Sequence, residues 1–409
     1  MNDSPTVLVI GGGATGTGTA RDLAMRGVET TLVERGGLGS GTSGRSHGLL
    51  HSGARYAEAD APGAAECLDE NRTLREIAGA CVRETGGLFL RLDGDDPEYF
   101  EEKLAACEEV GIETERIDGD TARERVPGLS ADVVEAFTVP DSVIYPSRLV
   151  AANAADAERH GATVHPHAPV EGIEVSDGGV SSVQVGGDVD AALEPEYVIN
   201  ATGAWADRIA ELAGVDVGMA PSRGVMISVK YEGVEPVLNR CRDPDDGDIV
   251  VPHDGEVVLG TTSVPVSDPD EYETADWEVE RSVEECASML PGVADAPTVR
   301  TWWGVRPLYA PDESGSERRG ISRGFTLIDH GGEGVSNLFS VVGGKLTTYR
   351  ERAEATADRV CERLGVDEPC KTASSRLPEA GDPDELDALV ERYGGSNPTD
   401  ADVVNAAGE

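Results

Sequence analysis

Residues 7–16 read VLVIGGGATG. Four apolar residues lead directly into a turn in which Gly11, Gly13 and Gly16 fit the pattern G-x-G-x-x-G. Glu34 follows 18 residues after Gly16, at the end of a second short strand-like run. A strand, a glycine turn, a helix, a second strand and a terminal acid make up the βαβ unit that binds a dinucleotide. This stretch therefore predicts a Rossmann-like α/β domain close to the start of the chain.

Each part of the motif has a mechanical role. Gly11 allows the tight turn, Gly13 lets the backbone approach a pyrophosphate, and Gly16 lets the helix pack closely on the sheet. The helix expected over residues 14–25 points its first N–H groups at the phosphates. Glu34 is expected to accept hydrogen bonds from ribose hydroxyls. The motif alone does not separate FAD from NAD.

Charge is the next informative property of the chain. Its 409 residues carry a formal net charge of −43, so nucleic acid is not an expected partner. Only four lysines stand against 30 arginines. We interpret this acidic, lysine-poor composition as an adaptation to high salt, because molar salt shortens the Debye length to about 3 Å and screens self-repulsion. The alternative is an ordinary acidic protein that meets a basic partner.

The cysteines and the chain start bear on metals and location. The chain has seven cysteines, none in a C-x-x-C motif, and no histidine cluster at ligand spacing. We therefore expect no metal site and reduced thiols that serve mostly as core residues. The start shows no signal peptide, and no apolar run approaches the roughly 18 residues that span a bilayer. These features predict a cytoplasmic protein, or one held at a membrane by a partner.

Three segments far apart in the sequence resemble strand ends that turn toward one site. Besides residues 7–16, these are residues 197–204, which read YVINATGA, and residues 338–345, which read LFSVVGGK. Residues 170–185 read as an antiparallel hairpin, and residues 61–140 show helical periodicity with little strand signal. Residues 220–310 alternate like an antiparallel sheet.

This interleaving predicts a discontinuous α/β (α+β) fold. We expect an FAD-binding domain at 1–60, 141–219 and 320–372, with an inserted substrate domain at 61–140 and 220–319. Residues 373–409 are acidic, contain prolines and are short of apolar periodicity, and they read as a tail or a truncated domain. A nucleotide fold assembled from separated segments around an inserted sheet is more typical of flavoproteins than of NAD dehydrogenases, and this favours FAD.

Polar residues gather beside glycines in three further stretches. Residues 41–56 read GTSGRSHGLLHSGARY, residues 302–308 read WWGVRPL, and residues 343–350 read GGKLTTYR. Small residues let a backbone run along an extended cofactor, and the His, Arg, Tyr and Lys side chains can line a site next to it. Lys345 is notable because lysine is rare in this chain.

These stretches, together with residues 321–323 (ISR) and 239–242 (NRCR), resemble the FAD-dependent glycerol-3-phosphate dehydrogenases. The form HGLLHSGARY is similar to the catalytic subunit of the anaerobic, membrane-associated enzyme. The resemblance covers roughly residues 5–380 and implies a flavoprotein of glucose-inhibited/D-amino-acid-oxidase-like architecture. The catalytic subunit of the anaerobic enzyme usually continues into a cysteine-rich C-terminal domain, and this sequence ends at Glu409 without one.

The resemblance also implies roles for individual residues. The proposed base corresponds to His51, and Arg306 and Lys345 complete the catalytic set. Substrate phosphate contacts correspond to Arg55, Tyr56, Arg306, Arg323 and Lys345. Positions lining FAD correspond to Gly11, Gly13, Ala14, Thr15, Gly16, Glu34, Arg35, Thr42, Ser43, His47, Gly48, Ala201, Gly203, Gly343, Gly344, Lys345, Leu346 and Thr347.

The implied activity is oxidation of sn-glycerol 3-phosphate to dihydroxyacetone phosphate, with hydride transfer to FAD. Electrons then pass to a quinone, directly or through iron–sulfur partner subunits on the cytoplasmic face of a membrane, and the chain could form an oligomer. Histidine suits the removal of the hydroxyl proton, and arginine suits a phosphate dianion. Two alternatives stay open: a flavin-dependent amine or 2-hydroxy-acid oxidoreductase, and a non-catalytic flavin-binding subunit of a complex.

Overall fold

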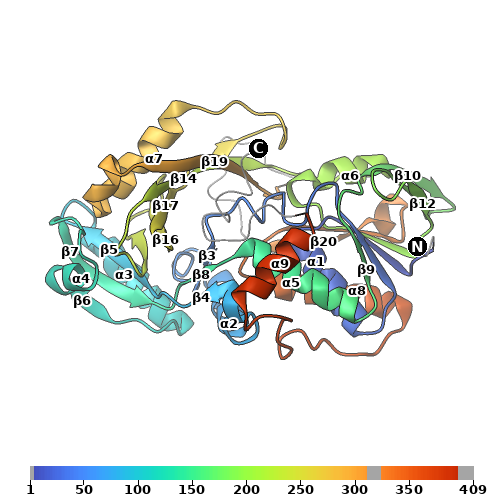
Figure 1. Ribbon diagram of the computed structural model, residues 1–409, viewed down its shortest axis with the longest axis horizontal. Coiled ribbons are helices and arrows are strands. Elements are labelled where there is room, and N and C mark those ends of the chain that lie inside the picture. Colours follow the sequence, from blue (N-terminus) through green and yellow to red (C-terminus); the bar gives the residue numbers. More distant parts are fainter. Residues whose placement is uncertain (1–3, 311–323, 395–409) are drawn as a thin grey trace.

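A computed structural model describes residues 4–310 and 324–394. Two sheets dominate the molecule and lie side by side in Figure 1. The first has six strands in the order β20-β21-β13-β1-β2-β9, and the second has nine strands. The fold is of the mixed α/β type that the sequence predicted.

The six-stranded sheet is parallel except for its edge strand β20. Its strands are β1 (Val7–Ile10), β2 (Thr30–Val33), β9 (Thr163–His165), β13 (Tyr197–Asn200), β20 (Phe325–Asp329) and β21 (Leu338–Gly343). Strands from separated parts of the sequence thus become neighbours: β1 pairs with β13, which pairs with β21. Their carboxyl ends lie along one edge of the sheet, where ligands of open α/β sheets bind.

Both faces of this sheet are covered, which explains why β1 is entirely apolar. Val7 and Val9 pack in a core with α1 (Ala14–Met25), α5 (Pro146–Arg159) and α8 (Tyr349–Leu364). Leu8 and Ile10 pack on the other face against α6 (Ala206–Leu212) and a three-stranded sheet. That smaller sheet consists of β10 (Val170–Ser176), β11 (Gly179–Val185) and β12 (Ala191–Leu193). The predicted hairpin over residues 170–185 is confirmed.

The nine-stranded sheet is mainly antiparallel. From residues 222–306 come β14 (Ser222–Lys230), β15 (Val237–Arg240), β16 (Ile249–His253), β17 (Glu256–Gly260), β18 (Val264–Pro265) and β19 (Thr298–Arg306). From the earlier segment come β5 (Gly87–Leu92), β6 (Arg116–Asp118) and β7 (Val133–Val139). Helices α4 (Gly119–Arg125) and α7 (Asp276–Met289) accompany these strands in Figure 1. A small sheet of β3 (Leu49–Leu50), β4 (Val82–Arg83) and β8 (Ser142–Ile144) lies between the two large ones.

Two regions differ from the sequence-based expectation. Residues 61–140 hold α2 (Ala61–Ile77) and α3 (Pro97–Val110) as expected, but also four strands. Tertiary pairing overrides the weak local signal, because β5 and β7 pair with each other and β5 extends the sheet beside β15. The described part of the C-terminal segment also contains a helix that the sequence analysis did not predict. Helix α9 (Pro383–Arg392) begins at Asp382, whose side chain accepts two backbone N–H bonds, and buries Leu386 and Val390 in the core beside α5.

Four short 3₁₀ helices complete the described elements: Gly79–Cys81, Gly203–Trp205, Pro291–Asp295 and His330–Glu333. All seven cysteines are free thiols; six are buried and Cys370 is half-buried. Within the described ranges, no helix combines the length and the apolar character that crossing a bilayer requires.

Candidate functional site

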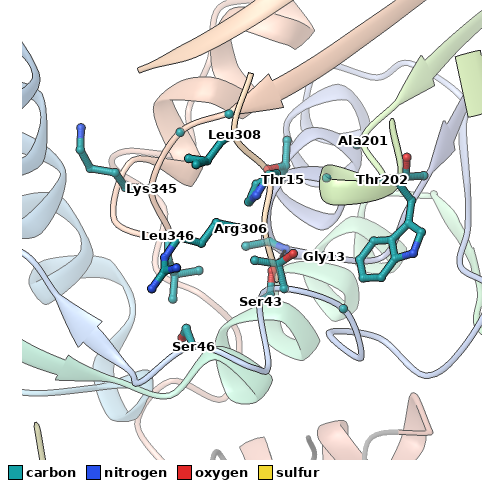
Figure 2. Close-up of a pocket in the computed structure, with 18 of the residues that line it drawn as sticks. Gly13, Thr15, Ser43, Ser46, Ala201, Thr202, Arg306, Leu308, Lys345 and Leu346 are labelled. Carbon is teal, nitrogen blue, oxygen red and sulfur yellow. Dashed lines mark hydrogen bonds between the residues drawn. The ribbon is translucent and has the colours of Figure 1, made fainter. Parts of the chain in front are cut away.

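A cavity of about 1140 Å³ opens where the carboxyl ends of β1, β13 and β21 face the second sheet. Its walls include Gly11 and Gly13 after β1, Ala201 after β13, Gly344 after β21, and Arg306 at the end of β19. Figure 2 shows Thr202, Ala201 and Gly13 toward one side, with Arg306 and Lys345 toward the other. The three strand ends that the sequence singled out therefore meet at one elongated site.

The glycine turn after β1 cannot accept side chains at two of its positions. Gly11 has φ +110°, and a Cβ there would lie 2.7 Å from the carbonyl oxygen of Ala201. A Cβ on Gly16 would lie 1.8 Å from the carbonyl oxygen of Gly11. These glycines let the turn, α1 and the neighbouring strand end approach one another closely, as the motif requires.

Glu34 and Ser43 hold the start of α1. The carboxylate of Glu34 accepts N–H bonds from Gly12 at 2.6 Å and from Gly36 at 2.9 Å, and it lines the cavity. The hydroxyl of Ser43 accepts the first helical N–H of α1, that of Ala14, at 3.0 Å. Thr42 donates to the Val305 carbonyl at 2.7 Å, which ties this loop to β19.

At the Glu34 end of the cavity, Arg35 is held by two surface contacts. It forms an ion pair with Asp270 at 2.9 Å and lies over the ring of Trp205, 4.4 Å from its centroid. Half of the Arg35 side chain is exposed, so the pair contributes little to stability. Arg35 and the indole of Trp205 therefore lie at the cavity wall beside Glu34, which directly follows β2.

Lys345 is the most unusual cation of the site. Its side chain is only 7% exposed, and its Nζ makes no hydrogen bond to the residues that the structure describes. It lies over the ring of Tyr56, 4.7 Å from the centroid. It also lies near the Cys67 thiol, whose pKa is raised by burial to about 12 although this ammonium opposes the rise. A buried ammonium without a paired anion is costly, so this position favours a negatively charged ligand.

Two arginines extend the positive wall. Arg306 donates from Nη2 to Thr261 Oγ1 at 3.0 Å and from Nη1 to the Arg223 carbonyl at 3.4 Å. Arg55 pairs with the buried carboxylate of Asp248 at 3.2 Å, and this pair fixes its direction. The two guanidinium groups come from distant parts of the sequence, one after β3 and one at the end of β19, and both line the cavity.

Two histidines lie beside these cations with different environments. Burial, together with the nearby charges of Arg306 and Arg55, lowers the pKa of His47 to about 3. Its Nδ1 accepts the N–H of Leu49 at 3.2 Å, which fits a neutral ring with the proton on Nε2. The ring of His51 makes edge contacts with those of His47 and Tyr56, at centroid distances of 6.2 and 5.4 Å.

The backbone around His51 is fixed from three directions. Its N–H donates to Thr347 Oγ1 at 3.1 Å, and its carbonyl accepts from Asn71 Nδ2 at 3.3 Å. The next N–H, that of Ser52, donates to Asp141 Oδ1 at 2.7 Å. Such support places the imidazole on a rigid segment at the cavity wall.

Most residues that the sequence singled out line this one cavity: Gly11, Gly13, Ala14, Thr15, Glu34, Arg35, Thr42, Ser43, His47, His51, Arg55, Tyr56, Ala201, Gly203, Arg306, Gly343, Gly344, Lys345 and Leu346. Three others lie behind the wall. Gly16 packs α1 on the turn, Gly48 lies against the Ile144 carbonyl, and Thr347 is fully buried and holds the His51 N–H. Arg323 lies outside the described residues.

Sequence reasoning missed several residues of the wall, among them Arg352, Thr261, Trp205 and Arg208. Arg352 follows the GGKLTTYR stretch by two residues. Its place on the same predicted helix was the one sequence signal that could have pointed to it. Thr261 and Trp205 carried no signal, because their position depends on how β17 and the turn after β13 face the cavity.

Residues 6–350 match the family described as FAD dependent oxidoreductase. The chain is 48% identical to the A1 subunit of the anaerobic glycerol-3-phosphate dehydrogenase of Haloferax volcanii, over 97% of this chain and 70% of that protein. It is 41% identical to the corresponding subunit of the Escherichia coli enzyme, over 94% and 72% of the two chains. The chain belongs to this anaerobic glycerol-3-phosphate dehydrogenase branch of the FAD-dependent oxidoreductases.

A solved structure agrees with this family assignment. The glycerol-3-phosphate dehydrogenase of Bacillus halodurans, complexed with FAD, superposes with a TM-score of 0.70 at 25% identity, covering 92% of this chain and 68% of that one. A glycine oxidase from Bacillus cereus shares the fold, with a TM-score of 0.68 at 22% identity, covering 91% and 98%.

The cofactor of this dehydrogenase homologue is FAD, and the cavity fits it. The glycine turn and the start of α1 can approach a pyrophosphate, and Glu34 stands at the end of β2 for a ribose. The cavity also exceeds the roughly 300–1,000 Å³ typical of a single small-ligand pocket, which leaves room for a substrate.

Proposed function

We propose that this chain oxidises sn-glycerol 3-phosphate to dihydroxyacetone phosphate with bound FAD. The observation that carries the proposal is the buried ammonium of Lys345, which has no hydrogen-bond partner among the described residues and faces the cavity that fits FAD. Arg306 and Arg55 line the same cavity, so its wall carries three cations, which suits a phosphate dianion. Identity of 41–48% to subunits of glycerol-3-phosphate dehydrogenases supports the same substrate.

The reaction removes a proton from the C2 hydroxyl and a hydride from C2. When bound, FAD supplies the acceptor for the hydride. His51 takes the hydroxyl proton in this proposal, because its backbone is fixed at the wall and its ring lies beside Tyr56. His47 is unsuited to this role, since its pKa of about 3 makes it a very weak base. Its neutral ring instead packs beside His51 and borders the cofactor.

The phosphate is oriented by side chains from three elements. Lys345 approaches from the turn after β21, Arg306 from β19, and Arg55 and Tyr56 from the loop after β3. In the same proposal Arg323 joins them. A substrate that is held by its phosphate presents C2 in a fixed place. This fixed orientation lowers the barrier to removal of the hydride and the proton.

The electron acceptor in this proposal is a quinone, reached directly or through iron–sulfur partner subunits. The relatives are named as single subunits of an anaerobic enzyme, and this supports an assembly with other chains. Such partners would keep the chain on the cytoplasmic face of a membrane.

Anaerobic titration of the purified yellow protein in high salt tests the proposal. Glycerol 3-phosphate is expected to bleach the flavin absorbance, while glycerol, glycine and lactate leave it unchanged. Bleaching by glycine or lactate alone would instead identify an amine or hydroxy-acid oxidoreductase. A flavin that no substrate bleaches, although dithionite does, would identify a flavin-binding protein without catalytic activity of its own.

A further inference from the structure

Five arginines are buried in the described part of the chain, and four of them have a carboxylate partner. The pairs are Arg21–Asp156, Arg26–Asp22, Arg223–Glu278 and Arg350–Glu70. Arg352 on α8 is the fifth, with 5% of its surface exposed, and it forms no ion pair with any described residue. Its burial lowers its pKa to about 10, so it remains charged at neutral pH.

The Arg352 guanidinium lies between the first turn of α1 and the end of β21, at the wall of the cavity. Its Nε donates to Thr15 Oγ1 at 3.0 Å, in the first turn of α1, and its Nη1 donates to the Gly343 carbonyl at 3.0 Å. A Cβ on Gly344 would lie 1.6 Å from Nη1, so glycine makes room for this group. Arg352 and Thr15 both line the cavity.

This position is electrostatically unfavourable without an anion. The first turn of a helix carries the positive end of the helix dipole, where cations are destabilised and anions are stabilised. Burial without a carboxylate adds a further cost, because a charge removed from water needs a compensating charge. Two independent features, the start of α1 and the unpaired guanidinium, therefore favour a negative group between Thr15 and Gly343.

We propose that Arg352 binds the diphosphate of FAD, together with the first turn of α1. The two groups make different contacts with the diphosphate: α1 offers neutral N–H donors, and Arg352 adds a formal positive charge. The inference rests on FAD binding in this cavity and not on the identity of the oxidised substrate. Acidic residues outnumber basic ones in this chain of net charge −43. A buried arginine therefore offers the diphosphate a positive charge that the surface as a whole does not.

Reconstitution of the apoprotein with FAD tests this role without any activity measurement. Arg352→Met removes the charge and keeps a similar chain length, and the FAD Kd is expected to rise about 10- to 100-fold. Arg352→Lys, which keeps the charge, is expected to recover part of the affinity. Arg359→Met is the control on the same helix: Arg359 pairs with Asp329 at 3.0 Å on the surface, and its loss should leave the Kd unchanged.

Two partial ligands distinguish the diphosphate from the flavin ring. ADP carries a diphosphate and no flavin, so its Kd for the apoprotein should rise with that of FAD in Arg352→Met. Riboflavin carries the ring and no phosphate, so its affinity should not change. An unchanged ADP Kd with weakened riboflavin binding would place Arg352 at the ring and overturn the proposal.

Apoprotein stability separates a ligand-binding role from a merely structural one. If Arg352 only tied Thr15 to Gly343, Arg352→Met would lower the apoprotein Tm and leave the FAD Kd unchanged. Since the charge is unpaired without FAD, we expect the Tm of the apoprotein to stay equal or rise. If Arg352→Met fails to fold, Arg352→Gln takes its place, because it loses the charge and keeps polar atoms: a wild-type FAD Kd in that variant would refute the proposal.

Discussion

Replacing Lys345 by Met should weaken glycerol 3-phosphate binding strongly while leaving FAD bound. Lys345 is 7% exposed and its ammonium makes no hydrogen bond in the described structure, so its loss leaves no described hydrogen-bond partner unsatisfied. We expect its contact with the Tyr56 ring to persist when substrate binds, so that this contact cancels in the binding free energy. What remains is a charge-assisted bond to phosphate, about 1.5–3 kcal/mol.

That energy corresponds to a rise of roughly 10- to 150-fold in Kd, at 1.4 kcal/mol per tenfold change. Because the group is buried, salt should screen it little, and the ratio of mutant to wild-type Kd should persist in molar KCl. Anaerobic flavin titration measures this ratio at low and high salt. Lys371→Met, which removes an exposed lysine paired with Glu368, is the matched control. A mutant to wild-type Kd ratio below about threefold, or a ratio that falls to one in molar KCl, would refute the buried phosphate contact.

Three further outcomes follow from the site. His51→Gln should slow flavin reduction by about 10²–10⁴-fold in stopped-flow experiments, with little change in substrate Kd; a loss below tenfold would leave His51 a structural residue. Gly16→Ala places a Cβ 1.8 Å from the Gly11 carbonyl oxygen and should abolish FAD retention, whereas Gly94→Ala, in open space, should not; a yellow Gly16→Ala protein would contradict this. Because the folded-state pKa of His47 is lowered to about 3, the unfolded state binds its proton first, so stability should fall as pH drops from about 6.5 toward 3. His47→Gln should reduce this slope in urea denaturation at pH 7 and pH 5, and an unaltered slope would disprove the assignment.

The elements that carried a local code were predictable from the sequence. Residues 7–34 have a fixed order of apolar run, glycines and acid, and each of these features acts over a few residues. The same holds for β13 and β21, because each strand leads into a turn that contains glycine, at Gly203 and at Gly343 and Gly344. The domain boundaries stay a prediction, because the arrangement of the sheets does not by itself define the residue at which one domain ends and the next begins.

What the sequence could not reveal depends on partners distant in the chain. Arg350 and Arg352 are two residues apart and so point to different sides of α8. Glu70, on α2, pairs with Arg350 and leaves Arg352 to face the cavity. Helix α9 is a different case, because Leu386, Leu389, Val390 and Tyr393 recur at helical spacing after Asp382 and Pro383, and this local signal was overlooked. The helix is held by burial of Leu386 and Val390 and by the Arg148–Asp387 pair.

Three of the segments that line the cavity are brought together only by the folded six-stranded sheet: residues 11–15, 201–203 and 343–346. A flavin bound there fastens the beginning, middle and late parts of one polypeptide into a single cooperative unit. Free FAD at 100 times its Kd would add about 2.7 kcal/mol to folding. A cell that runs short of flavin would thus hold this protein in a looser form, open to proteolysis, and its lifetime would follow the vitamin supply.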